Sequence, residues 1–414
     1  MSPPRELWRS VFSPRMLVAF LMGFSCGLPL LLTITVLQAW MKEEGVDLGV
    51  IGLFSLVGLP YTVKFLWAPL LDRYTLPFLG RRRGWLLLAQ VGLALAIVAL
   101  GFCQPARHPW LLALAAFMVT FFSASQDIVV DAYRREDLKD RELGLGSSLY
   151  VNGYRLGMLL ASGGGLMLAD HISFSQVYFI MAGCMSLGIV TTLLCREPPA
   201  EMGVPQSLKE SVVGPFVEYF SRGGVKWGLG LLIFILLYKI GDSMAAAMTI
   251  PFYLDLGFTK TQIGAVAKIF GFWATIGGGL LGGILMLRLG INRSLWVFGF
   301  LQAVSTAGFA LLAHIGPSLA WLTGVIAFEN LTGGMGTSAY VAFMAALTNK
   351  RFTATQYALL SSLMGIPRVM ASAPTGFLAE ALGWSGFFTF CTLAAAPGML
   401  MLVVYAPWGR RPEK

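Results

Sequence analysis

The stretch "DRYTLPFLGRRRG", from Asp72 to Gly84, joins two long apolar segments of the chain. Asp72 follows the first apolar segment, residues 50–71, and Arg81 to Arg83 precede the second, residues 85–103. Each segment has about 20 mostly apolar residues, the length that a helix needs to cross a bilayer. The stretch is therefore typical of a short, strongly charged turn between two transmembrane helices.

Composition supports a membrane protein. Of 414 residues, 56% are hydrophobic and only 12% are charged, whereas soluble domains average about 25% charged residues. The five cysteines lie scattered in apolar runs and form no CxxC pair or ligand cluster, so we interpret them as packing residues and expect no metal and no cofactor. Residues 1–14 are short and polar and lead into a full-length apolar run, so no cleavable signal peptide is expected.

Apolar runs long enough to span a membrane recur along the whole chain. No short alternating segments typical of a β-barrel are present, so these runs predict an all-α membrane protein. Twelve spans are expected, at roughly 16–40, 50–71, 85–103, 110–133, 143–168, 174–195, 226–254, 262–287, 294–313, 318–347, 354–379 and 385–407.

Basic residues predict the orientation of these spans. The termini and the even-numbered connections hold 22 of the 30 Lys and Arg residues, while the opposite connections hold only Lys42, Arg107 and Lys260. Positive charge gathers on the cytoplasmic side of membrane proteins, so both termini are expected there. This distribution also explains the net charge of +9 without a nucleic-acid partner.

The longest connection divides the chain into two similar halves. It covers residues 196–225 and contains an amphipathic segment, residues 207–220, expected on the inner membrane surface. "SSL" at Ser147 recurs at Ser361, and "SGGGLMLAD" from Ser162 corresponds to "SAPTGFLAE" from Ser372, with offsets of 214 and 210 residues. We expect two six-helix bundles, residues 1–195 and 226–414, which is the arrangement of the major facilitator fold.

Two aspartates close the fourth apolar run, in "FFSASQDIVVDAYRRE", from Phe121 to Glu136. Measured from the expected cytoplasmic end, Asp127 lies ~10 Å deep and Asp131 ~5 Å deep, on one face of the helix. The helix could end here with both carboxylates in water. Asp131 is close enough to Arg134 to serve as a structural cap, but we interpret Asp127 as facing an interior path.

Further charges fall inside the expected spans, where each costs on the order of 2.5–3.5 kcal/mol on insertion scales. Asp127 with Arg155, and Glu329 with Arg368, are natural pairs because each half has an acid on its fourth helix and an arginine on its fifth. Lys239 lies three residues before Asp242, a spacing that permits an ion pair. Structural ion pairs are the alternative to a functional role for all of them.

Protons and substrate would need different side chains. The histidines lie in outer loops, so carboxylates must carry any protons, and Asp127, Asp242 and Glu329 are the candidates; sodium coupling stays open. Basic groups can hold substrate carboxylates and aromatic rings can stack on sugars, although helix packing or an interfacial belt is the alternative for each aromatic residue. The substrate-binding candidates are Gln38, Trp40, Tyr61, Lys64, Gln126, Tyr150, Asn152, Arg155, Lys239, Asn330 and Arg368.

The charged turn also resembles a known motif. An acid at a helix end followed by an Arg-rich turn is similar to the cytoplasmic loop 2–3 motif of major facilitators, in which these groups bridge helix ends and steady the outward-facing state. "RLGINRS" from Arg288 looks like a degraded copy without the acid. Positive charge on the inner side alone is the alternative. The gating candidates are Asp72, Arg73, Arg81, Arg82, Asp131 and Arg134.

Several longer blocks resemble the AmpG-type muropeptide permeases, a branch of the major facilitator superfamily, over nearly the whole chain. They include "GFSCGLPLLLTITVLQAWM" from Gly23, "IGLFSLVGLPYTVKFLWAPLLDRYTLPFLGRRRGWLL" from Ile51, "SASQDIVVDA" from Ser123, "GYRLGML" from Gly153, "LYKIGD" from Leu237, "FENLTGGMGTSAYVA" from Phe328 and "ATQYALLS" from Ala354. The family's charged positions correspond here to Lys64, Asp127, Asp131, Arg155, Lys239, Asp242, Lys268, Glu329 and Arg368.

The resemblance implies import of GlcNAc-1,6-anhydro-MurNAc, with or without peptide, from periplasm to cytoplasm by proton symport. It also implies a role in cell-wall recycling and, where a β-lactamase is inducible, in its induction and so in antibiotic resistance. Some family members continue beyond twelve helices, and related branches carry siderophores or acetyl-CoA, so import of a siderophore or another organic anion is the alternative. The resemblance also implies a location in the bacterial inner membrane. We expect a monomer whose partners are the bilayer, protons and this small molecule.

Other classes of function are disfavoured. An enzyme acting on lipid-linked sugars would need a catalytic cluster, but the sequence has no HExxH, no CxxC and no GxSxG in a suitable turn. A P-loop is also missing, which disfavours ATP-driven pumping. A passive channel fits poorly with two similar halves and charges at mid-depth. We therefore expect a secondary active transporter that works by alternating access, and not an enzyme.

Overall fold

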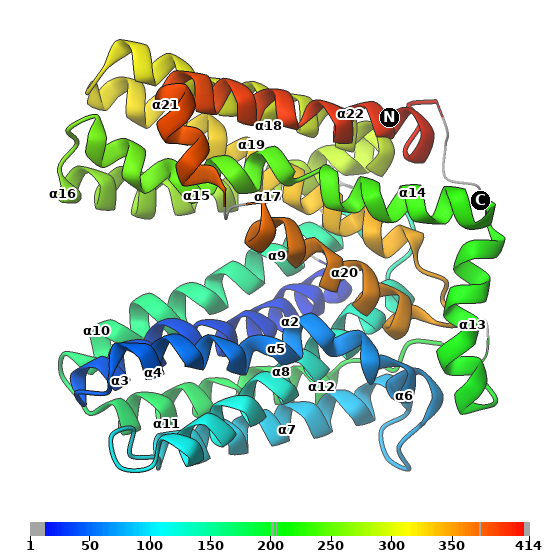
Figure 1. Cartoon of the computed structure of the whole chain (residues 1–414). Coiled ribbons are helices and arrows are strands. Elements are labelled where there is room, and N and C mark those ends of the chain that lie inside the picture. Colours follow the sequence, from blue (N-terminus) through cyan, green and yellow to red (C-terminus); the bar gives the residue numbers. More distant parts are fainter. Residues whose placement is uncertain (1–12, 200–202, 204, 372–373, 410–414) are drawn as a thin grey trace. The chain divides into compact units, whose positions relative to one another are not determined.

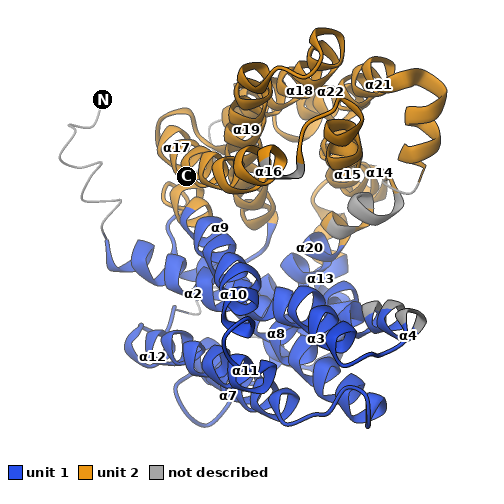
Figure 2. Ribbon diagram, turned by 90° about the vertical axis from the view of Figure 1, so that its left-hand side faces the viewer, with its two compact units in different colours: residues 1–139, 149–216, 348–362 blue, residues 140–148, 217–347, 363–414 orange. Residues whose placement is uncertain are grey.

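The computed structural model describes residues 13–199, 203, 205–371 and 374–409. Every regular element in this part of the chain is a helix, as the apolar runs predict (Figure 1). The chain divides into two compact units, which are coloured separately in Figure 2. Unit 1 comprises residues 1–139, 149–216 and 348–362, and unit 2 comprises residues 140–148, 217–347 and 363–414.

Unit 1 is built from the first half of the chain and the start of one late helix. Its helices α7, α8 and α11 run beside one another in Figure 1. The elements of the first half are α2 (Pro14–Leu31), η1 (Leu32–Val36), α3 (Leu37–Glu43), α4 (Leu48–Leu53), η2 (Phe54–Gly58), α5 (Leu59–Val63), η3 (Lys64–Leu66), α6 (Ala68–Arg73), α7 (Arg81–Gly101), α8 (Pro109–Asp137), α9 (Leu143–Leu159), η4 (Leu160–Gly164), α10 (Gly165–Ala169), α11 (Phe174–Cys184), α12 (Ser186–Leu194) and α13 (Leu208–Ser221).

Unit 2 holds most of the second half. Helix α19 packs along both α17 and α18, and α21 packs against α15 and α18. The elements are α14 (Gly224–Leu237), α15 (Ile240–Asp255), α16 (Lys260–Ile263), η5 (Gly264–Phe270), α17 (Gly271–Leu289), α18 (Ile291–Ile315), α19 (Leu319–Leu347), α20 (Thr353–Met370), α21 (Thr375–Ala394) and α22 (Ala396–Tyr405). The first residues of α9 belong to unit 2 and the first residues of α20 to unit 1.

Eight helical segments in the described residues are long and apolar enough to cross a membrane, against the twelve spans expected. They are 14–43, 81–101, 109–137, 174–194, 224–255, 264–289, 291–315 and 375–405. The other four expected spans correspond to the pieces α4 to α6, to α9 with α10, to α19 and to α20. The chain is therefore a multi-pass membrane protein, and among these four segments α19 is one unbroken helix of 29 residues.

The second expected span, residues 50–71, is not one helix but five short pieces. Pro60 and Pro69 occupy the first turns of α5 and α6. Proline lacks a backbone N–H and fits best in the first turn of a helix, and here each of the two prolines marks a restart. The last of the short 3-10 pieces begins at Lys64.

The expected boundary between the last two spans is also displaced. Helix α20 ends at Met370, where the prediction continues to residue 379, and α21 begins at Thr375. Within α21, Gly383 has φ 67° and ψ 167°, a conformation that breaks the helix and that glycine alone adopts without strain. Residues 372–373, in the second copy of the sequence repeat, lie outside the described part of the chain.

Glycine faces bring the helices of each unit into close contact. In unit 1, a Cβ at Gly23 or Gly27 of α2 would overlap the backbone of α9 at Tyr150 and Tyr154. In unit 2, a Cβ at Gly278 of α17 would overlap the backbone of Leu331 on α19. Small residues let helices in a membrane approach until their backbones touch, and van der Waals contact then holds them together.

The connection between the halves contains a helix, α13, at the segment that was expected to be amphipathic. Helix α13 buries Ser211, Pro215 and Tyr219 on one face and exposes apolar side chains such as Val213 and Val217 on the other. The change from unit 1 to unit 2 falls inside this helix, after Phe216. The division into domains at residues 196–225 stays a prediction.

Candidate functional site

Asp127 lies inside unit 1, where α8 is buried on nearly every side. Its residue is only 6% exposed, and its Oδ1 accepts no hydrogen bond from any described residue. The charges that act on it are those of Lys64, itself 6% exposed at the start of η3, and of Asp131 one turn along α8. An acid so placed can be stabilised either by the nearby ammonium group or by a proton.

The surroundings of Asp127 contain several groups that can form hydrogen bonds. The Gln126 amide donates to Cys26 Sγ at 3.2 Å, and the Tyr61 hydroxyl donates to Ser123 Oγ at 2.9 Å. Asn152 on α9 is 1% exposed, and neither polar atom of its side chain has a hydrogen-bond partner among the described residues. A fully buried amide without partners is costly, and such groups call for an explanation such as a ligand.

Asp131 has a structural partner, as expected from its spacing to Arg134. Arg134 Nη2 lies 3.1 Å from Asp131 Oδ1 and donates to the Tyr357 hydroxyl at 3.1 Å. Its guanidinium also lies 4.6 Å from the centre of the Tyr150 ring. Helix α8 continues to Asp137, so the expectation that Asp131 caps the helix end is wrong. Asp131 instead fixes an arginine that joins α8, α9 and the first turns of α20.

The charged turn at residues 72–84 forms a buried cluster. Arg82 is completely buried, and its Nη2 lies 2.8 Å from Asp72 Oδ1 and 2.6 Å from Glu136 Oε1. Arg81 Nη2 also bonds to Glu136 Oε1, at 2.7 Å. Two arginines therefore face two carboxylates, and the charges balance. Buried charges are tolerated when they are paired in this way, although Arg81 Nη1 has no hydrogen-bond partner among the described residues.

Asp72 also binds the start of a helix 283 residues further along the chain. Its carboxylate accepts hydrogen bonds from the backbone N–H of Ala354 (3.2 Å) and Thr355 (2.8 Å) and from the Thr355 hydroxyl (2.7 Å). These N–H groups belong to the first turn of α20, where no carbonyl of the helix can accept from them. Asp72 therefore acts as an N-cap supplied from another helix, at the end where the helix dipole favours a negative charge.

Two acids in this region were missed by the sequence analysis. Glu136 completes the arginine cluster, and Glu197 accepts from the backbone N–H of Arg82 (2.7 Å) and Arg83 (3.0 Å), which caps α7. In the sequence both are glutamates next to basic residues, and nothing in that pattern identifies their partners. Only the fold shows them. Arg73 was expected in the gate, but its contact is with the ring of Tyr74, at 5.6 Å, outside the cluster.

Unit 2 has a second polar cluster, centred on a lysine. Lys239 Nζ lies 3.3 Å from Asp242 Oδ2, which confirms the ion pair permitted by the spacing, and donates to Gln302 Oε1 at 2.8 Å. Lys239 stands at a break between α14 and α15, with φ −110° and ψ 9°. Lys64 also begins a new helical piece, so Lys64 and Lys239 both stand at a discontinuity in their helices. Broken helices are common at the sites of transporters.

Glu329 joins this cluster from α19. It accepts a short hydrogen bond from the Ser305 hydroxyl, which in turn accepts from Thr332 Oγ1 at 3.0 Å. The charges of Asp242 and Lys239 act on its carboxyl group. Lys239, Asp242 and Glu329 therefore form one cluster of a cation and two acids in unit 2.

The remaining substrate-binding candidates do not lie together in one cluster. Trp40 packs against Phe174 and Tyr178 in the apolar core of unit 1, with ring centres 5.9 and 5.4 Å apart, which favours the packing alternative. The Asn330 side chain is held by Thr275 Oγ1 at 2.8 Å. Gln38 and Arg155 are half-buried in unit 1, and the side chain of Arg368 lies outside the described residues. The pairs Asp127–Arg155 and Glu329–Arg368 stay predictions.

Metal ligands are not gathered in the described part of the chain. No group of three or more His, Cys, Asp or Glu side chains there could hold a metal ion.

Comparison with known proteins shows which proteins the chain is similar to. Residues 15–372 match the family described as the Major Facilitator Superfamily. The chain is 46% identical to the anhydromuropeptide permease of Escherichia coli K12 over 393 residues, which cover 94% of this chain and 79% of that protein. It is 42% identical to an uncharacterized protein of Haemophilus influenzae, over 99% of this chain and 98% of that one.

Solved structures show the same fold at low sequence identity. The proton:xylose symporter XylE, bound to 6-bromo-6-deoxy-D-glucose, superposes with a TM-score of 0.71 at 11% identity and covers 95% of both chains. FucP in the outward conformation superposes with a TM-score of 0.70 at 13% identity, over 95% of this chain and 99% of FucP. These likenesses concern the fold.

Proposed function

The chain belongs to the Major Facilitator Superfamily and, within it, to the family of the anhydromuropeptide permease, and we propose that it imports peptidoglycan fragments from periplasm to cytoplasm. The proposed substrate is GlcNAc-1,6-anhydro-MurNAc with or without its peptide. The observation that carries this proposal is the 46% identity to the E. coli permease across 94% of the chain. A sugar acid fits the cationic and aromatic groups near Lys64 and Tyr61.

The driving force that we propose is the proton gradient. Two separate sites can take up a proton, Asp127 beside Lys64 and the acid pair of Asp242 and Glu329 beside Lys239. In each site a lysine competes with the proton for the carboxylate. A substrate carboxylate that draws the lysine away would leave the acid to bind a proton, and substrate and proton binding would then favour each other.

The gate that we propose is the cluster around Asp72. Its contact with the first turn of α20 joins α6 and α7 of the first half to a helix of the second half. Alternating access needs helix ends that can separate, and at Asp72 this contact consists of three hydrogen bonds to one carboxylate. Asp72, Arg82 and Glu136 would hold one state of the cycle, and Arg134 with Asp131 would reinforce it.

The placement of charge supports both termini in the cytoplasm, so that the Asp72 cluster lies at the inner face of the inner membrane. We propose that the chain acts as a monomer there. Import would then return wall fragments to the cytoplasm for reuse.

Counterflow in proteoliposomes tests the substrate. Vesicles that contain the purified chain and unlabelled GlcNAc-1,6-anhydro-MurNAc should take up the labelled disaccharide from outside, and protein-free vesicles should not. Counterflow needs no gradient, so it reports substrate identity independently of coupling. Exchange of a ferric siderophore, with none of the disaccharide, would contradict the proposal.

A further inference from the structure

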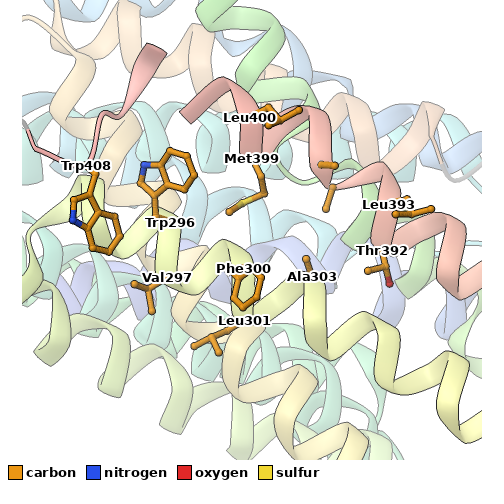
Figure 3. A pocket seen from close by; sticks show the side chains of 12 residues that line it. Trp296, Val297, Phe300, Leu301, Ala303, Thr392, Leu393, Met399, Leu400 and Trp408 are labelled. Atoms are coloured by element: carbon orange, nitrogen blue, oxygen red, sulfur yellow. The ribbon is translucent and has the colours of Figure 1, made fainter. Parts of the chain in front are cut away.

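An apolar groove lies on the surface of unit 2, between α18 and the two segments α21 and α22 (Figure 3). Its volume is about 560 Å³. Large side chains form its walls, Phe300 and Leu301 on α18 and Leu400 on α22, while Ala303 and Ala396 leave room between them. The groove is thus a product of small residues placed where α21 gives way to α22.

The lining is apolar along the middle of the groove. The Trp296 indole N–H donates to the carbonyl of Ala406 at 2.9 Å, and the Thr392 hydroxyl donates to the carbonyl of Phe388 at 2.9 Å. Trp408, at one end, also carries an indole N–H, and the other lining side chains are apolar. A ligand must therefore be apolar along the groove, because burying an unpaired polar group there would cost free energy.

The open side of the groove faces hydrocarbon. Leu400, Leu393 and Phe300 are 71%, 65% and 63% exposed, on helices that cross the membrane. From Trp296 to Ala303 the groove follows α18 for seven residues, ~10 Å at the helical rise, about a third of the hydrocarbon thickness. An empty hollow of this size would deprive its walls of contacts, and a lipid tail is the apolar partner present at this depth.

One end of the groove carries a positive charge. Trp296 and Trp408 lie at the same end of it (Figure 3), and tryptophan is typical of the headgroup level of membranes. Arg293 donates from Nε to the carbonyl of Trp408 at 3.1 Å and stacks over its ring at 5.9 Å. The bond uses Nε, so the donors of both Nη groups can bind an anion such as a phosphate.

We propose that this groove binds one anionic phospholipid, with an acyl chain along Phe300 and Leu400 and the phosphate on Arg293. The bound chain also touches the wall of a second, small cavity of about 20 Å³, which Asp242 and Gln302 line. Ala303, Ala395 and Met399 line both hollows. The lipid therefore supports the wall behind the lysine–carboxyl cluster, independently of which substrate the protein carries.

Lipid titration of the purified full chain in detergent tests the proposal, with bound lipids counted by native mass spectrometry. Dioleoyl-phosphatidylglycerol should occupy one site at about fivefold lower concentration than dioleoyl-phosphatidylcholine, the factor expected of one arginine beside an anionic headgroup. Arg293→Gln should abolish this preference. Arg288→Gln, an exposed arginine at the end of α17 and outside the groove, should retain it.

A second variant tests the acyl chain. Ala396 is exposed and lines the groove, so Ala396→Phe should fill it without disturbing the fold, and retention of both lipids at this site should fall at least as much as in Arg293→Gln. An unchanged melting temperature in lipid-free detergent shows that the variant is folded. Equal binding of the two lipids by the natural chain, loss of the preference in Arg288→Gln, or undiminished binding in Ala396→Phe would overturn the proposal.

Discussion

Single residues carry the proposed coupling, and Asp127 is the simplest case. Its carboxyl group is buried beside one lysine, and one of its oxygens lacks a hydrogen bond from the described residues. Burial disfavours the charged form of a carboxyl group, while Lys64 favours it. The balance between these two effects is what a substrate carboxylate on Lys64 could change.

Replacing Asp127 with Asn removes the exchangeable proton and keeps the shape of the side chain. We expect Asp127→Asn to lose accumulation driven by a pH gradient while keeping counterflow, measured in the same proteoliposomes. Asp170→Asn, an exposed acid on the same unit, is the matched control and should behave as the natural chain. Gradient-driven accumulation at the natural rate in Asp127→Asn would exclude this acid as a proton carrier.

For Asp242 and Glu329 in unit 2, we expect that the losses of proton-driven accumulation in the two single variants do not add in the double variant. Asp242→Asn and Glu329→Gln each remove one acid of the proposed proton site, so the double variant should be no worse than the more severe single variant. Residues in direct contact typically show interaction energies of about 0.5–3 kcal/mol in such cycles. Accumulation ratios for the four proteins supply the measurement, and losses that simply add would show that the two acids act separately.

The sequence indicated which charged and polar residues lie inside the membrane spans, but it predicted their contact partners only in part. The pair Lys239–Asp242 follows from helical spacing and is confirmed. Contacts between distant segments, such as Arg82 with Glu136 or Lys239 with Gln302, depend on helix rotation, which periodicity does not determine. Gln302 did carry a signal, a lone amide in an apolar run, since such a group needs a partner in hydrocarbon.

At the scale of helices, the Asp72 cluster is the feature that links elements far apart in the chain. Asp72→Asn leaves Arg82 without one of its two carboxylates and weakens the cap of α20. Breaking a buried ion pair by removing one partner costs about 3–5 kcal/mol, so a clear fall in the melting temperature in detergent is expected.

Arg73 provides the control for this prediction. It lies at the end of the same short helix as Asp72 but outside the cluster, so Arg73→Gln should leave the melting temperature nearly unchanged. Equal falls for the two variants would mean that the whole turn matters rather than the carboxylate of Asp72.

Helix contacts through glycine give a second prediction at this scale. A Cβ at Gly27 would overlap the backbone of Tyr154, whereas one at Gly183 would meet nothing within 4 Å. Gly27→Val should cost more than the ~1–3 kcal/mol typical of overpacking, because a backbone cannot rotate away. Gly183→Ala should be neutral or stabilising. Expression level and melting temperature of the two variants decide the matter, and a stable Gly27→Val protein would contradict the close packing of α2 and α9.

Helix positions were predicted better than helix continuity. Hydropathy finds apolar runs, but residues 50–71 look continuous although Pro60 and Pro69 restart the helix twice. The breaks at Lys64 and Lys239 were not expected either. Interrupted hydrogen bonding near a charged group costs stability, and such breaks persist where a site uses them.

At the scale of the whole molecule, the family and the helical fold were predictable because both follow from long apolar runs and from sequence blocks that cover both halves. The exchange of short segments between the two compact units was not predictable from the sequence. The first residues of α9 belong to unit 2, and the first residues of α20 belong to unit 1. Because the first residues of α20 belong to unit 1, Asp72 meets this helix.

Concentrative uptake tests the central claim, proton-coupled import of a wall fragment, most directly. Proteoliposomes with an alkaline lumen and an acidic outer medium should accumulate labelled GlcNAc-1,6-anhydro-MurNAc above its external concentration, and a protonophore should reduce the ratio to equilibrium. Uptake that reaches the same level with and without the gradient, or no uptake at all, would contradict the account.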